Sequence, residues 1–197
     1  VVTAQKRAQN VQDVPIAISA FTSAALQERA VGDVSALSGL APNVTLDAGT
    51  PFSGSKSVLG AYIRGIGAAD FAFNLDPGVG VYLDGVYLAR SIGANQDLPD
   101  VERIEVLKGP QGTLFGRNTI GGAISIVTRD PAREFGFQGD VTLGSYQRMQ
   151  VRASTDIPIT EALRSSLTFS MINRKGYQRR LDYDAGQAYV IDGATSF

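Results

Sequence analysis

The sequence predicts an α+β domain of short mixed strands and short helices, followed by longer antiparallel strands. Up to about residue 130, short alternating segments are interleaved with helix-capping residues and with many of the 22 glycines, which is typical of a turn-rich α+β chain. Beyond Asp130-Pro131 the pattern changes to longer runs in which apolar and polar residues alternate.

The composition excludes several classes of function. The 197 residues contain no Cys and no His, which rules out thiol nucleophiles, Ser-His-Asp triads, zinc sites and most transition-metal sites. Apolar residues make up 44% and the net charge is -1, so neither global disorder nor a broad nucleic-acid-binding surface is expected. No apolar run approaches the roughly 18 residues of a membrane-spanning helix. No signal peptide is visible at Val1, so an exported form would have had its signal removed or omitted.

The first third of the chain mixes strands and helices. Residues 14–21 alternate and predict a short strand. Thr22 is a suitable N-cap for a helix over residues 23–29, and Asp33 is a suitable N-cap for a second helix. A further strand is predicted over residues 58–64.

The strongest local signal is a β-hairpin over residues 81–88. Asp84-Gly85 separates two alternating runs, and this dipeptide favours a type I′ turn because both central positions need positive φ. The register that follows pairs Leu83 with Val86, Tyr82 with Tyr87, and Val81 with Leu88.

Two more strands are predicted in the second half of this domain. Residues 103–108 read as a strand with Ile104 and Val106 on its buried side. Pro110 then begins a short helical turn, because Pro is tolerated at the first helical position. A last strand is predicted over residues 123–128.

Three amphipathic runs follow, over residues 137–146, 148–157 and 163–173. Each has one apolar and one polar face over about ten residues, the length and period of a transmembrane barrel strand. A soluble antiparallel sheet with one solvated face has the same alternation, and the pattern alone does not separate the two. Three strands leave an open edge that lipid cannot satisfy, so the membrane alternative predicts that further strands complete the barrel.

The glycine-rich loops lack the signatures of nucleotide binding. Residues 112–116 are followed by no Gly-Lys-Ser/Thr, and residues 65–70 lack the third glycine of a dinucleotide fingerprint. Acidic side chains are present at Asp76, Asp84 and Glu105, but nothing in the pattern orders two of them into an acid/base pair. The sequence therefore predicts no enzyme, no catalytic residue and no cofactor.

Taken in order, the motifs resemble the plug of TonB-dependent outer-membrane receptors. The most specific stretch is VERIEVLKGPQGTLFGRN at residues 101–118, which continues into GGAI at residues 121–124. Shorter elements are VVTAQKR at 1–7 (similar to the end of a TonB box), QDVP at 12–15 with Ile18, YIRGIG at 62–67, PGV at 77–79 and LDG at 83–85. The structural motif positions are Gly65, Gly67, Asp84, Gly85, Gly109, Pro110, Gly116, Gly121 and Gly122.

The resemblance implies an α+β plug domain followed by the first antiparallel strands of a transmembrane β-barrel. It divides the chain into a TonB-box-like segment (1–7), the plug domain (8–130) and an incomplete barrel start of about three strands (131–197). The plug is expected inside the barrel, in the outer membrane of a Gram-negative bacterium, with the N-terminus in the periplasm.

The implied function is that of a gate in an active transporter for a scarce ligand, either a ferric siderophore or another large nutrient. Expected partners are TonB with its inner-membrane energising complex, outer-membrane lipid around the barrel, and the ligand; no nucleic acid and no metal site in this chain are expected. TonB would pair by strand addition with Val1, Val2, Thr3 and Ala4.

The resemblance also assigns roles to charged and aromatic side chains. Arg64 and Lys108 would pair with acidic residues of the barrel wall and latch the plug in place; the alternative is that both are exposed surface charges. Segments at the extracellular end offer four candidates for ligand contact, which could equally be ordinary loop residues: Phe71, Phe73, Arg90 and Asn95.

The alternative function is a soluble periplasmic β-rich ligand-binding module without a role in transport. This module predicts that residues 131–197 stay soluble and folded without detergent. A passive porin is disfavoured by the long α+β segment ahead of the first barrel-like strand. Iron-siderophore, cobalamin, haem and oligosaccharide transporters share this plug, so the sequence leaves the ligand open.

Overall fold

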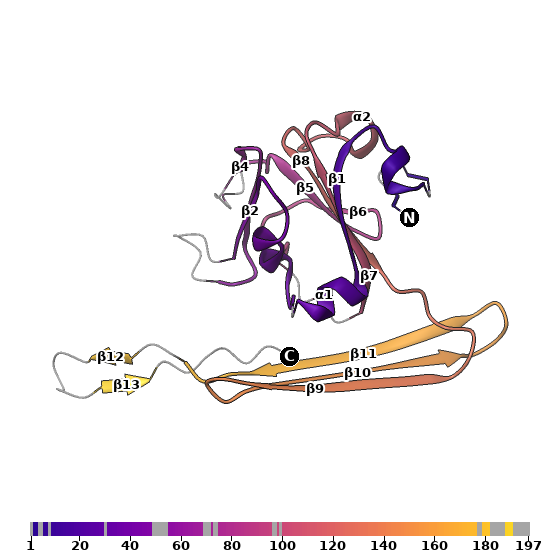
Figure 1. The fold of residues 1–197 in the computed structure, drawn as a ribbon, viewed down its shortest axis with the longest axis vertical. Coiled ribbons are helices and arrows are strands. Elements are labelled where there is room, and N and C mark those ends of the chain that lie inside the picture. The colour runs from indigo at the N-terminus through magenta and orange to yellow at the C-terminus, as the bar shows by residue number, and fades with distance from the viewer. Residues whose placement is uncertain are drawn as a thin grey trace. The chain divides into compact units, whose positions relative to one another are not determined.

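In a computed structural model of the chain, the described residues are 2–3, 6–7, 9–29, 31–48, 55–68, 72, 75–95, 98, 100–176, 179–181 and 188–190. The backbone divides into two compact units, Val1–Arg129 and Asp130–Phe197. Figure 1 shows the elements of both units as a ribbon. Within the described ranges, no helix is both long enough and apolar enough to cross a membrane.

The first unit is built from short strands and short helices, which confirms the predicted α+β class (Figure 1). Its elements are η1 (Val11–Asp13), β1 (Ala17–Thr22), α1 (Ser23–Glu28), η2 (Val34–Gly39), β2 (Val44–Ala48), β3 (Leu59–Ile63), β4 (Ile66–Ala68), β5 (Val79–Leu83), β6 (Val86–Leu88), β7 (Val101–Lys108), α2 (Gly112–Phe115) and β8 (Gly122–Thr128).

Both predicted N-caps begin a helix. The side-chain oxygens of Thr22 and Asp33 accept the N–H of the third residue on, at 3.4 and 3.1 Å. The second helix, η2, is a 3-10 helix, and the Leu40 N–H bonds to the Leu37 carbonyl three residues back.

The helical turn after β7 does not begin at Pro110, so that prediction is wrong. α2 begins two residues later, at Gly112. The reason is that the preceding backbone pairs with the approach to β8: the Gln111 N–H bonds to the Thr119 carbonyl at 2.9 Å. Residues on both sides of α2 are therefore held together as a closed loop.

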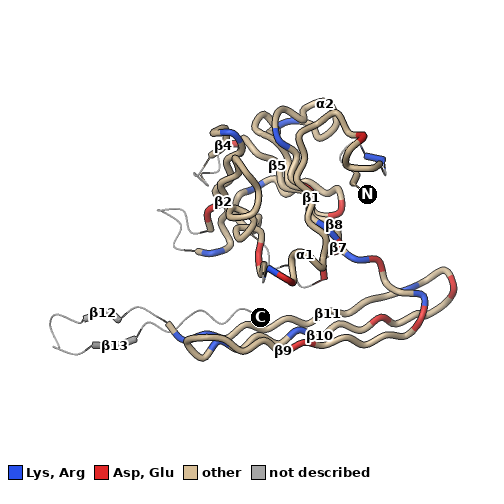
Figure 2. The backbone as a smooth tube through the Cα atoms, viewed as in Figure 1, with Lys and Arg blue, Asp and Glu red and all other residues tan. Residues whose placement is uncertain are grey.

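The central sheet of the first unit has the strand order β1-β7-β8-β5-β6. β5 and β8 run parallel, and the other neighbouring pairs are antiparallel. β1, β5 and β8 carry no charged residue, and the backbone tube is tan along them in Figure 2. β5 and β8 are buried over most of their length, which explains why they read as nearly continuous apolar runs.

Both faces of the central sheet are covered. Ile104 and Val106 of β7 lie in the main core, as predicted, and are fully buried. Leu107 points to the opposite face because side chains alternate along a strand. There it packs in a smaller cluster with Val2, Val14, Tyr82 and Ala123.

A three-stranded sheet, β2-β3-β4, lies beside the main core. The predicted hairpin is confirmed in β5 and β6, with the register expected from its Asp-Gly turn. Asp84 has φ 48° and Gly85 has φ 81°, as a type I′ turn requires. The sequence pattern predicted neither β2 nor β4.

The second unit contains the three long strands predicted after residue 130: β9 (Gly136–Gly144), β10 (Arg148–Pro158) and β11 (Arg164–Asn173). They form an antiparallel sheet with β10 in the centre. A short pair, β12 (Arg179–Leu181) and β13 (Ala188–Val190), follows.

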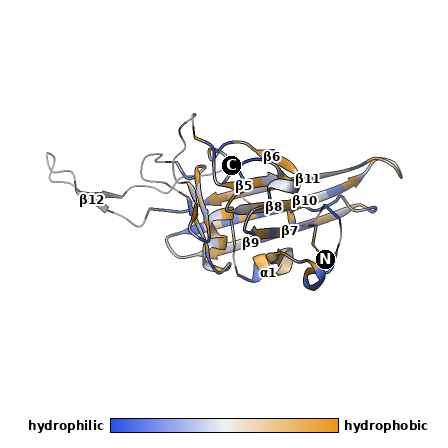
Figure 3. Ribbon diagram, turned by 90° about the horizontal axis from the view of Figure 1, so that it is seen from above, coloured by the Kyte–Doolittle hydropathy of each residue, from blue (hydrophilic) through white to orange (hydrophobic). Residues whose placement is uncertain are grey.

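The register of this sheet places its apolar residues on one face. Val151 lies opposite Val141 and Met171, and Ala153 lies opposite Phe169. The hydropathy alternation can be followed along β9, β10 and β11 in Figure 3. Among the described residues the apolar face is uncovered: Phe137, Val141, Leu143, Leu167 and Phe169 are 72, 64, 75, 67 and 52% exposed.

Candidate functional site

The N-terminal segment of the first unit is docked on the sheet face that carries Leu107. Val2 is 1% exposed and forms an antiparallel bridge with Gln9, through two backbone hydrogen bonds of 2.9 and 3.0 Å. Of the predicted coupling residues, Val1 and Ala4 lie outside the described residues. Val2 and Thr3 both contact the central sheet of the first unit.

Thr3 binds a buried carboxylate on β7. Its N–H donates to both oxygens of Glu105, at 2.8 and 3.0 Å, and its hydroxyl donates to Oε1 at 3.1 Å. Arg103, two residues earlier on the same strand face, donates from Nε to Oε1 at 2.8 Å and from Nη2 to the Thr3 hydroxyl at 3.1 Å. The three residues thus form a closed ring of hydrogen bonds, which we call the Thr3–Glu105–Arg103 ring.

The charges in this ring compensate one another. The Glu105 side chain is 0% exposed, so it requires a positive partner close by. Burial lowers the pKa of Arg103, but its hydrogen bond to Glu105 and the charges of Glu102 and Glu105 outweigh burial and raise it. Arg103 therefore remains charged and supplies that partner. It also pairs with the exposed Glu102.

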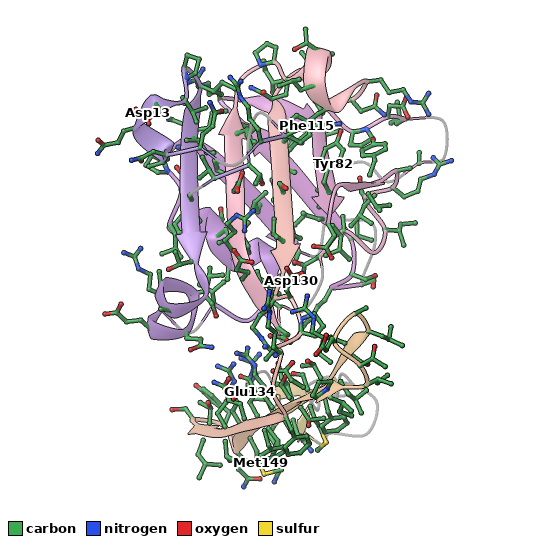
Figure 4. The ribbon with its side chains drawn as sticks, turned by 90° about the vertical axis from the view of Figure 1, so that its right-hand side faces the viewer. Asp13, Tyr82, Phe115, Asp130, Glu134 and Met149 are labelled. Atoms are coloured by element: carbon green, nitrogen blue, oxygen red, sulfur yellow. The ribbon has the colours of Figure 1, made fainter. Side chains whose placement is uncertain are left out.

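Two aromatic side chains, Tyr82 and Phe115, lie beside the N-terminal segment. The Tyr82 hydroxyl donates to the Phe115 carbonyl at 2.6 Å, and the two rings meet edge to face with centroids 5.0 Å apart (Figure 4). Burial raises the pKa of Tyr82, and Tyr87 raises it further. Lys6 lies 5.9 Å from the Phe115 ring centroid. A cavity of about 460 Å³ opens between Lys6, Thr3 and these aromatic rings.

The two predicted latch residues lie close together although they are distant in sequence. A Cβ placed on Gly109, next to Lys108, would lie 3.4 Å from Arg64 Nη1. Burial lowers the pKa of Lys108, and the charge of Arg64 lowers it further. In the part of the chain that is described, neither cation has a carboxylate at ion-pair distance. Arg64 is exposed and Lys108 is half-buried, so this end of the sheet presents two neighbouring positive charges.

The glycine motif marks close backbone contacts between neighbouring segments. A Cβ on Gly67 would lie 1.9 Å from the Ala61 carbonyl oxygen, and one on Gly122 would lie 2.2 Å from the Leu107 carbonyl oxygen. The remaining motif positions lie in the two tight turns, in the loop between β7 and β8, or directly after α2: Gly65, Asp84, Gly85, Gly109, Pro110, Gly121 and Gly116.

The structure describes two of the four predicted ligand-contact residues, Arg90 and Asn95. Phe71 and Phe73 lie outside the described residues. The Asn95 side chain holds the fold, because its oxygen accepts the Ser35 N–H at 3.0 Å and its amide donates to the Lys56 carbonyl at 2.8 Å. Arg90 lines a very small cavity between β3, β4 and β5. Their role in ligand contact stays a prediction.

Sequence reasoning did not identify the Thr3–Glu105–Arg103 ring. In the sequence Glu105 stands out only as one of several acidic residues, although Arg-x-Glu on a strand places both side chains on one face. That spacing was the available signal, but Thr3 lies 102 residues away in sequence. Within the described ranges, no group of three or more acidic side chains could hold a metal ion.

Comparisons with known proteins agree with this architecture. The family model for the TonB-dependent receptor plug domain matches residues 10–123. The pesticin receptor of Yersinia pestis is 45% identical over 69 residues, which cover 35% of this chain and 10% of that receptor. The iron-regulated outer membrane virulence protein of Vibrio cholerae is 32% identical over 168 residues, covering 79% of this chain and 23% of that protein. The chain thus spans less than a quarter of these relatives' length.

Solved structures show the same fold. The ferric yersiniabactin uptake receptor FyuA from Yersinia pestis superposes with a TM-score of 0.64 at 26% identity, over 81% of this chain and 24% of that one. The ferripyoverdine receptor of Pseudomonas aeruginosa gives a TM-score of 0.72 at 20% identity, over 91% of this chain and 23% of that one. At that identity the second match speaks for the fold alone. Because the family model spans more than half of its residues, the chain belongs to the TonB-dependent receptor plug domain family.

Proposed function

We propose that the chain is the plug and the first barrel strands of a TonB-dependent transporter that takes up a scarce ligand across the outer membrane. Residues 8–130 form the plug, residues 131–197 begin the barrel, and residues 1–7 couple to TonB. The observation that carries the proposal is the continuity in one chain of a plug domain and a sheet with an uncovered apolar face. In this role the chain gates a path and performs no bond chemistry.

The barrel assignment rests on the two faces of β9, β10 and β11. Contiguous exposed apolar surface marks a membrane or partner contact, and here it follows every second residue of strands of membrane-spanning length. The opposite face carries Arg152 opposite Asp140 and Ser170, as a wet lumen requires. A soluble module would need another layer to cover the apolar face.

The paired cations support a latch between plug and barrel wall. Arg64 and Lys108 lie together with their mutual repulsion uncompensated inside the described part of the chain. Acidic side chains of the barrel wall would neutralise both at once, and breaking such a buried pair would leave an uncompensated charge.

The ligand class is taken from what relatives are named for. They include a metal-pseudopaline receptor of Pseudomonas aeruginosa and a catecholate siderophore receptor of Escherichia coli. We propose a ferric siderophore or a chemically similar metal complex as cargo, bound outside the residues that form the plug core. The cargo is substrate and not a resident group of this chain.

The coupling role is tested by deleting residues 1–7 in the intact transporter. Binding of a panel of ferric siderophores should be unchanged, while growth on the bound siderophore as sole iron source should be lost. A variant with the same seven residues in shuffled order separates the effect of sequence from that of length. Undiminished uptake by both variants would contradict coupling. Fractionation separates the alternative function, because a soluble module would be recovered from the periplasm.

A further inference from the structure

The N-terminal segment is held to the plug by one polar contact and one apolar one. Val2 fills a place in the small cluster formed with Val14, Tyr82, Leu107 and Ala123. Thr3 closes the ring with Glu105 and Arg103 through its N–H and its hydroxyl. The contact joins the first residues of the chain to the centre of the plug sheet.

We propose that Glu105, oriented by Arg103, is the plug's own binding site for the N-terminal segment. Occupation of this site by Thr3 keeps the segment from pairing with its partner. This inference rests on the proposed coupling role of residues 1–7 and names the plug residues that retain them. Glu105 and Arg103 are positioning residues in this scheme.

One oxygen of the Glu105 carboxylate depends on the N-terminal segment for its hydrogen bond. Its Oε1 accepts from Arg103 as well as from Thr3, but the Thr3 N–H is the only partner of Oε2 within the described residues. A buried carboxylate oxygen without a donor costs free energy. Departure of Thr3 therefore has to be matched by water at Oε2, and the cavity of about 460 Å³ beside Thr3 and Arg103 offers space for it.

The same geometry explains why the segment can leave without unfolding the plug. Arg103 stays beside Glu105 after Thr3 departs, so the negative charge remains paired. Among the described residues Val2 forms a backbone bridge only with Gln9, so no strand of the central sheet has residues 2 and 3 as ladder partners. The Thr3–Glu105–Arg103 ring is therefore a contact that can open and close again, and we call it the clasp.

The test uses the intact transporter in detergent, with any cysteine outside this Cys-free chain replaced beforehand. Val2→Cys places a thiol at a position that is 1% exposed, so maleimide reacts with it only when the segment undocks. Adding Glu105→Gln, or Thr3→Pro, which removes the N–H donor, should raise the labelling rate about tenfold or more, the factor expected for a hydrogen bond to a charge.

Two controls make the outcome decisive. Glu102→Gln removes the other carboxylate that pairs with Arg103. The Glu102 side chain bonds to none of the described N-terminal residues, so this variant should leave the rate unchanged. Val34→Cys, at a fully buried core position, should stay unlabelled in both test variants if the plug remains folded. If Glu105→Gln unfolds the plug, Thr3→Pro alone decides. Rates within about twofold of the Val2→Cys parent would overturn the proposal.

The assay needs neither TonB nor uptake, so its result is independent of the proposed function. Suppose that the test variants are labelled faster, but that deletion of residues 1–7 leaves uptake undiminished. This result would refute coupling and still support the clasp. Loss of uptake with no change in labelling would refute the clasp and leave coupling in place.

Discussion

Asp84 and Thr128 are joined by two hydrogen bonds of 2.8 Å, from the Thr128 N–H to Oδ1 and from its hydroxyl to Oδ2. Asp84 is the first turn residue of the β5–β6 hairpin, and Thr128 is the last residue of β8. The contact fixes the tip of the hairpin to the end of the strand beside it, where the plug sheet finishes.

Because of this contact, two substitutions of Asp84 should differ in how much they lower the free energy of unfolding. Asp84→Asn keeps a residue that tolerates positive φ and one acceptor, so we expect a loss of about 1 kcal/mol in the free energy of unfolding. Asp84→Ala loses both acceptors and adds backbone strain, and should cost about 2–3 kcal/mol. Thermal unfolding of the intact protein in detergent measures both. Equal effects would show that the positive-φ turn conformation and the acceptor that Asn retains contribute nothing.

Replacing Gly67 by Ala should be among the most damaging single changes in the plug. The new Cβ would lie 1.9 Å from the Ala61 carbonyl oxygen, and backbone on both sides would have to move. We expect a loss of about 3 kcal/mol or more. Gly39→Ala is the matched control, because nothing lies within 4 Å of its Cβ position, and it should be near neutral. A small effect at Gly67 would contradict the close packing of β3 and β4.

Because the Tyr82 hydroxyl is buried, the stability of the plug should fall at alkaline pH. Its folded-state pKa is raised above the ordinary value of 10.0, so its contribution is fully present below that value. The contribution is lost as pH rises through the folded pKa, because the unfolded chain ionises first. Tyr82→Phe should therefore melt earlier near neutral pH, having lost the bond to the Phe115 carbonyl, but should lose less stability on going to pH about 11. If the melting temperatures of both proteins fell by the same amount between neutral pH and pH about 11, this prediction would be contradicted.

The two faces of β11 should differ in their tolerance of charge. Phe169→Lys places a charge on the apolar face and should destabilise the membrane-inserted protein by about 2–4 kcal/mol if this site is near the bilayer midplane. Ser170→Lys, one residue on, places the same charge on the opposite face and should cost little. Folding into lipid vesicles, followed by urea titration, compares them. Equal tolerance would argue for a soluble sheet.

Elements defined by neighbouring residues could be predicted from the sequence. The hairpin follows from Asp84-Gly85, and the strands of the second unit follow from their two-residue period, because both signals are local. The start of α2 was misplaced because Gln111 pairs with Thr119, and that pairing competes with the helix.

What could not be predicted depends on contacts between distant segments. β2 carries only five residues, and its partner β3 begins after a long connection. The two predicted latch residues follow individually from their motifs, but their proximity depends on how β3 and the end of β7 are brought together. The ring at Glu105 combines a strand pattern with a residue near the start of the chain, and no local rule links the two.

The position of β1 has a mechanical consequence. In the described part of the chain β1 pairs with β7 alone, so it can be peeled from the sheet while every other strand pair stays intact. Of the residues of β1, Ala17 is the first that a pull on the N-terminal segment would reach, and Ala17 lies opposite Lys108. Within the β1–β7 pair, the first residue pair to separate under tension is thus the one that contains Lys108, so force applied to the N-terminal segment would reach the paired cations before the rest of β7.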